Sequence, residues 1–195
     1  SIVAAVEGGC NVIDTAINYR HMRSERDVGA ALAQLFAAGQ AQRDELIVCT
    51  KGGFLPFDGA PPTDRLGYVQ EKLDELDLAP LDMVGGVHCM APAYLSQQIG
   101  LSLANLGLKT IDVYYLHNPE TQLQYVTPDE FRARLRAAFE RLEQEVADGR
   151  IRFYGVAAWD GLRAGRQDRR YLPLYQLVGM AQQVGGDKHH FRFLQ

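Results

Sequence analysis

The chain has 195 residues, 47% of them hydrophobic and 23% charged, which is typical of a folded globular domain and excludes a disordered one. Its 24 acidic and 20 basic residues are mixed along the sequence and give a net charge of -4, so we expect no nucleic-acid surface. No apolar run reaches the roughly 20 residues that a membrane helix needs, and the first residues do not resemble a signal peptide.

Three widely spaced cysteines, Cys10, Cys49 and Cys89, favour a reducing compartment over a disulfide framework. Together with the lack of targeting features, they indicate a cytoplasmic protein. His88 lies next to Cys89, but adjacent side chains point apart and no second pair at ligand spacing accompanies them. We therefore expect no metal site.

Short apolar runs typical of strands alternate with helical patterns from end to end. The strand-like runs span residues 11–13, 46–50, 111–116, 152–156 and 191–194. The first helix is expected to begin at Ser24, with Asp27 completing a capping box, and to end before Gly39. Later helices are expected over residues 68–78, 95–106, 127–148 and 173–184, the last three followed by glycine.

This alternation favours parallel strands with helical crossovers, in either an open doubly wound sheet or a closed barrel. An open sheet that binds a dinucleotide would show a Gly-x-Gly-x-x-Gly turn after its first strand, and the sequence has none. A barrel is therefore favoured. Residues 52–93 form a long connection that we expect at the active-site face, where it would shape substrate choice.

Titratable side chains follow three of the predicted strands, namely Asp14, Lys51 and His117. In barrels the carboxyl ends of the strands carry the catalytic groups. Taken singly, each has an ordinary explanation: Asp14 as a turn cap, Lys51 as a solvated lysine and His117 as a hydrogen-bonded rim residue. Tyr19 by itself would be an ordinary loop aromatic. Their succession at strand ends favours a catalytic role.

Several segments in order resemble the aldo-keto reductase family. Gly9 to Ala16 followed by Asn18-Tyr19 is similar to its first signature, which continues from Ser24 to Leu32; the other similar segments are 46–51, 102–119 and 149–156. The resemblance implies an α/β fold, a TIM (β/α)8-type barrel that is incomplete in this chain. Residues 1–195 would form a single partial barrel domain covering roughly the second to sixth strands.

The resemblance implies NADPH-dependent reduction of small aldehydes or ketones, with NADH as the alternative cofactor. Tyr19 would be the proton donor. A phenol has a pKa of about 10, so it needs a nearby cation, the role implied for Lys51, with Asp14 holding the ammonium. His117 would orient the substrate carbonyl.

Two departures from the family pattern weaken the cofactor half of this expectation. Ala157-Ala158 stand where the family commonly has a serine and an asparagine that bind the nicotinamide carboxamide, while Gln195 matches a family glutamine with the same task. No segment resembles the first strand or the last two strands of the family barrel, so we expect this chain to be inactive by itself. The alternative is a non-catalytic relative that binds a nucleotide or a protein partner.

Other residues leave their roles open. Trp159 follows a strand end and either lines a pocket or packs against the barrel. The basic run from Arg163 to Arg170 and the pair His189-His190 are expected to face solvent. A barrel aldolase or isomerase with Lys51 as a Schiff-base nucleophile would leave Tyr19 and His117 unexplained. Nothing in the sequence indicates an oligomeric state.

Overall fold

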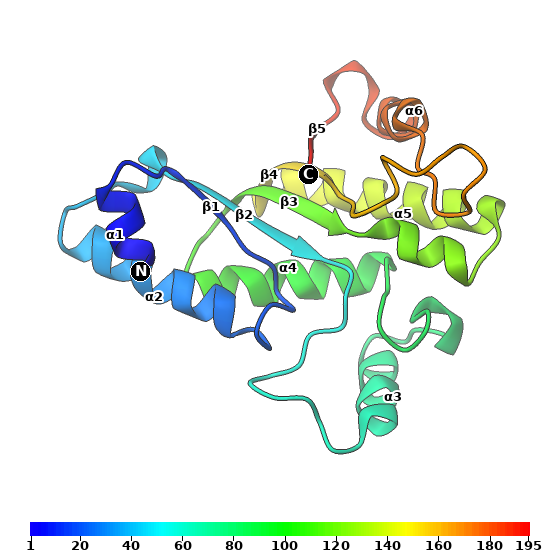
Figure 1. Ribbon diagram of the computed structural model, residues 1–195, viewed down its shortest axis with the longest axis horizontal. Coiled ribbons are helices and arrows are strands. Elements are labelled where there is room, and N and C mark those ends of the chain that lie inside the picture. The colour runs from blue at the N-terminus through cyan, green and yellow to red at the C-terminus, as the bar shows by residue number, and fades with distance from the viewer.

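The computed structural model describes residues 1–195 and contains one sheet of five parallel strands (Figure 1). The strands follow one another across the sheet in sequence order, with β1 and β5 at its edges. They are β1 (Val12–Asp14), β2 (Ile47–Gly52), β3 (Ile111–His117), β4 (Ile151–Ala157) and β5 (Phe191–Leu194). This order confirms the parallel α/β arrangement predicted from the alternating pattern.

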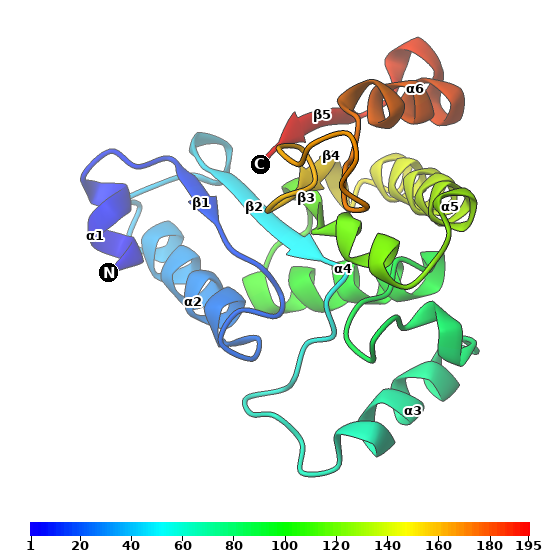
Figure 2. The ribbon, with the colours of Figure 1, turned by 45° about the vertical axis from the view of Figure 1, so that its right-hand side comes forward.

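All helices except α1 lie in the connections between strands, and α2, α4 and α5 lie side by side along one face of the sheet (Figure 2). They are α1 (Ile2–Glu7), α2 (Arg23–Ala37), α3 (Arg65–Glu75), α4 (Pro92–Leu106), α5 (Pro128–Ala147) and α6 (Leu174–Gly185). No helix has the length and apolar composition needed to cross a lipid bilayer.

The main core lies between the sheet and these helices because strand side chains alternate between its two faces. Val48, Tyr114 and Val156 point toward the helices and are buried among helix residues such as Leu32 and Phe139. The opposite face carries Cys49 and Val113 as register partners, so two positions further along it also carries Lys51. The lysine therefore ends on the face away from the helices.

Most helix ends follow the sequence signals. Thr127 caps α5 by accepting a hydrogen bond from the Glu130 N–H, with Pro128 at the first helical position, and Gly107 ends α4 in the left-handed conformation. The capping box predicted at Ser24 is wrong, because α2 begins at Arg23 after a left-handed Met22. The Ser24 hydroxyl instead accepts a hydrogen bond from Thr15 Oγ1.

The connection between β2 and α4 contains α3, which stands apart from the sheet in both views (Figures 1 and 2). It has a small core of its own that includes Leu55, Leu73 and Cys89. All three cysteines are free thiols, Cys10 exposed and Cys49 and Cys89 buried. Burial raises the pKa of Cys49 to about 11 and that of Cys89 to about 12.

Candidate active site

Four predicted site residues meet at the carboxyl ends of the strands. Strands β2 and β3 are longer than their apolar runs suggested, so Lys51 and His117 lie within them, while Asp14 ends β1. Tyr19 lies in the turn that follows β1. Two residues before it, the Ile17 N–H donates a hydrogen bond to the Lys51 carbonyl and so ties this turn to β2. The parallel register of β1 to β3 is what brings these side chains together.

Lys51 is at the centre of the group, and its side chain is only 2% exposed. The ammonium donates to Asp14 Oδ2 at 2.6 Å and to the Thr15 carbonyl at 2.9 Å. It also lies 5.1 Å from the centroid of the Tyr19 ring. A buried ammonium needs such partners, because an unpaired charge at this depth would be strongly destabilising.

Tyr19 and His117 face each other across the pocket. Their rings are edge to face with centroids 5.7 Å apart, and Tyr19 is 39% exposed whereas His117 is 5% exposed. Burial, together with the charge of Lys51 and the nearby His88, lowers the pKa of His117 to about 3. The imidazole is therefore neutral at physiological pH.

His88 supports His117 through a hydrogen bond to its backbone, a role that the sequence did not reveal. It is fully buried, and its Nε2 lies 2.8 Å from the His117 carbonyl oxygen. Gln122 Nε2 lies 2.9 Å from His88 Nδ1, so Nδ1 accepts this hydrogen bond and Nε2 carries the proton donated to His117. Burial lowers the pKa of His88 to about 4. The spacing of residues in the sequence does not predict which histidine donates a hydrogen bond to a backbone carbonyl, so this contact could not be foreseen.

Tyr19, Lys51 and His117 line a pocket of about 430 Å³, and Asp14 reaches it only through its ion pair with Lys51. Its other walls come from the ends of β3, β4 and β5 and from the loop after β4: Asn118, Ala157, Ala158, Trp159, Leu162, Arg163 and Gln195. Trp159 therefore lines the pocket, which decides between the two interpretations of this residue. Two polar atoms beside the pocket, His117 Nδ1 and Asn118 Oδ1, are buried without a hydrogen-bond partner.

A larger pocket of about 690 Å³ lies between α5 and α6, and none of the four residues lines it. The smaller pocket is the better candidate because it holds Tyr19, Lys51 and His117, the last with a strongly shifted pKa. No cluster of three or more His, Cys, Asp or Glu side chains that could hold a metal is present.

The basic run faces solvent as predicted at Arg163, Arg166 and Arg169, whereas three other residues expected at the surface have partners or are buried. His189 is buried, and His190 Nδ1 lies 2.7 Å from Glu143 Oε2. Within the basic run, Arg170 pairs with Asp160 at 2.6 Å and with Asp168 at 2.9 Å. These partners are acids distant in sequence or in a loop, which a charge pattern alone does not reveal.

Comparison with known proteins places the chain in a family. Residues 1–167 match the model of the aldo/keto reductase family. The chain belongs to this family. It is 28% identical over 156 residues to the 6-dehydroglucose reductase of Novosphingobium aromaticivorans, covering 79% of this chain and 39% of that protein. It is likewise 28% identical over 160 residues to the NADH-specific methylglyoxal reductase of Escherichia coli, covering 82% and 40%.

Solved aldo-keto reductase structures share the fold. The glycerol dehydrogenase AKR11B4 from Gluconobacter oxydans gives a TM-score of 0.57 at 23% identity, covering 94% of this chain and 41% of that one. Aldo-keto reductase AKR2E5, solved in complex with NADPH, gives 0.53 at 18% identity, covering 80% and 36%. The predicted barrel fold, incomplete in this chain, is confirmed. The chain spans about 40% of the length of the curated relatives named above.

Proposed function

We propose that the protein containing this chain reduces aldehydes or ketones to alcohols, using a nicotinamide dinucleotide as the hydride donor. The observation that carries the proposal is the buried Lys51, held by Asp14 beneath the ring of Tyr19, with His117 at the edge of that ring. Family membership supports the reaction class. One relative is named a methylglyoxal reductase, so methylglyoxal is a suitable probe.

In this mechanism Tyr19 gives its phenolic proton to the carbonyl oxygen as hydride reaches the carbonyl carbon. A reduced nicotinamide, when bound, supplies that hydride. The ammonium of Lys51 stabilises the negative charge left on the tyrosine oxygen, and its burial strengthens the attraction. Asp14 keeps the ammonium in place. His117, neutral because its pKa is about 3, offers one N–H donor to the carbonyl oxygen.

The pocket walls offer groups that suit a nicotinamide. Gln195 contributes an exposed amide, and Asn118 Oδ1 is buried without a partner, so a small shift would let it accept from a ligand. Ala157 and Ala158 contribute no polar side chain. We propose NADPH as the cofactor, in line with solved relatives that hold NADPH or NADP, although one relative is NADH-specific.

Replacing the proton donor tests the proposal. In the complete protein, Tyr19→Phe should lower kcat for methylglyoxal by about 100-fold or more, because general acid catalysis is lost. Tyr175→Phe is the matched control, since Tyr175 is exposed on α6 and lies away from the pocket. An unchanged rate in Tyr19→Phe would rule out this tyrosine as the acid.

A second candidate is a non-catalytic relative that binds nucleotide or a partner protein, and the apolar pair Ala157-Ala158 at the pocket favours it. Titrating the complete protein with NADPH and with NADH separates the two. The reductase should bind at least one of them and turn over methylglyoxal. Binding without turnover, or no binding of either, would favour the second candidate.

A further inference from the structure

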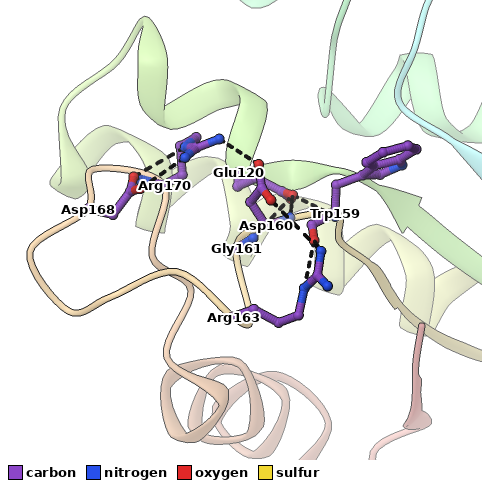
Figure 3. Close-up of polar contacts among 7 residues, drawn as sticks. All are labelled: Glu120, Trp159, Asp160, Gly161, Arg163, Asp168 and Arg170. Atoms are coloured by element: carbon purple, nitrogen blue, oxygen red, sulfur yellow. Dashed lines mark hydrogen bonds and ion pairs between the residues drawn. The ribbon is translucent and has the colours of Figure 1, made fainter.

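The loop that follows β4 is anchored by one buried carboxylate. Glu120 Oε1 accepts hydrogen bonds from three consecutive N–H groups, those of Trp159 at 2.9 Å, Asp160 at 3.3 Å and Gly161 at 3.4 Å (Figure 3). Glu120 itself lies in the short turn after β3, three residues beyond His117, and is 4% exposed. A single side chain thus joins the segments that follow β3 and β4.

The other side of the same loop is held by arginines. The Trp159 carbonyl accepts from Arg163 Nε at 3.2 Å and from Nη2 at 2.7 Å. Arg170 binds Asp160 at 2.6 Å and Asp168 at 2.9 Å (Figure 3). The backbone of Trp159 is therefore fixed at both its N–H and its carbonyl, although the residue as a whole is 72% exposed.

The fixed backbone of Trp159 matters because the neighbouring wall of the pocket has no polar side chain at residues 157 and 158. Ala157 and Ala158 have only methyl side chains, so Trp159 is the first large side chain after them on this wall of the pocket. The position of such a wall depends on the loop backbone. Gly161 lets the loop pass close to Leu172 and Glu120, since a Cβ there would lie 2.7 Å from Leu172 Cδ1 and 3.2 Å from the Cβ of Glu120.

We propose that Glu120 is a positioning residue that fixes the Trp159 wall of the pocket beside His117. It acts through the three N–H groups, and its carboxylate does not contact the ligand. Bonds to a charged acceptor are the stronger class, and three on one oxygen leave the loop little freedom. That the pocket binds a nicotinamide dinucleotide rests on the proposed function.

The test compares Glu120→Ala and Glu120→Gln with Glu145→Gln. Glu145 is fully buried between Arg141 and Arg150 near the end of α5, away from the pocket, and serves as a control for loss of stability alone. Trp159 is the only tryptophan of the chain, so the fluorescence anisotropy of this chain, measured at one fixed low concentration, reports the mobility of the loop.

Glu120→Ala should lower the Trp159 anisotropy, and in the complete protein it should raise KM for NADPH roughly tenfold while kcat changes less than about threefold. Glu120→Gln keeps an acceptor oxygen without the charge and should give an intermediate anisotropy and KM. It also serves as the test if the alanine variant does not fold. Glu145→Gln should lower only the melting temperature.

Unchanged anisotropy in both Glu120 variants would overturn the inference, as would an equal decrease in Glu145→Gln. The anisotropy measurement needs no turnover. It therefore stays decisive for Glu120 even if the Tyr19→Phe experiment or the cofactor titration rejects the proposed reductase activity.

Discussion

At the scale of single residues, two buried neutral histidines adjoin each other at the pocket: His117 lines it, and His88 bonds to the His117 carbonyl. His88 is completely buried and His117 nearly so, and burial holds the pKa of the first at about 4 and of the second at about 3. An unfolded histidine titrates near 6.5. The folded protein therefore resists a proton that the unfolded chain accepts.

This difference predicts an acid-sensitive fold. Between about pH 6.5 and pH 4 the unfolded state binds more protons at His88 than the folded state, so the free energy of unfolding falls as the pH falls. The contribution is roughly 1.4 kcal/mol for each pH unit in that window, and is absent above it. The free energy of unfolding, measured with urea from pH 4.5 to 7.5, should change less steeply with pH in His88→Gln than in the parent.

The comparison of slopes isolates His88 from other titrating groups, such as the buried Glu25, whose pKa is raised by burial. His190→Gln is the control, because His190 is partly exposed and paired with Glu143. Equal slopes in the parent and His88→Gln would mean that His88 is already protonated in the folded state.

The sequence pointed to the candidate catalytic residues more readily than to the residues that support them. Asp14, Lys51 and His117 could be found because they follow apolar strands, and Tyr19 because of a family motif. His88 and Glu120 bind backbone groups of residues distant in the chain, and such contacts leave no pattern in one sequence. Their roles required the register of the sheet and the path of the loops.

At the scale of elements, α2 and α4 approach each other unusually closely. A Cβ on Gly29 would lie 2.3 Å from the Asn105 carbonyl oxygen and 3.0 Å from the Leu106 carbonyl carbon. Glu25, on the same helix, is buried and accepts a hydrogen bond from Asn105 Nδ2. The pattern of strands and helices was visible in the sequence, but this helix contact was not. A glycine within a helix is unfavourable by propensity, and the sequence does not show which neighbour requires it.

Gly29→Ala should therefore destabilise the protein by about 1–3 kcal/mol, since the two backbones must separate. Gly179→Ala offers the opposite case. Gly179 lies within α6, and no packing partner comes within 4 Å of the place that a Cβ would take. Alanine there should raise the free energy of unfolding by about 0.5–1 kcal/mol, because it has the higher helix propensity. Thermal and urea unfolding of both variants checks the signs. A stabilising Gly29→Ala would contradict the close helix contact.

At the scale of the whole molecule, the face of the sheet opposite the helices exposes several apolar side chains away from Lys51. Val12 and Ile47 are register partners on this face, and Phe153 contacts Phe193 edge to face; all four are exposed to a substantial degree. β1 and β5 each have an unpaired edge. Exposed edges and apolar patches favour association.

The 195-residue chain should accordingly self-associate as its concentration rises. Ile47→Thr combined with Phe153→Thr should weaken this association, because threonine suits a strand but removes apolar surface. Leu66→Thr, at an exposed position on α3, is the control and should leave it unchanged. Sedimentation velocity across a concentration series measures the effect. A parent chain that remains monomeric throughout would contradict the prediction.

The two buried cysteines allow the opening of separate parts of the molecule to be timed. Cys49 lies in the sheet beside Val113, whereas Cys89 lies in the small core beneath α3. Neither thiol can react with a disulfide reagent until its surroundings open. The labelling rate of Cys89 thus measures the local opening of the α3 region, and that of Cys49 the opening of the sheet, with the exposed Cys10 as an internal reference.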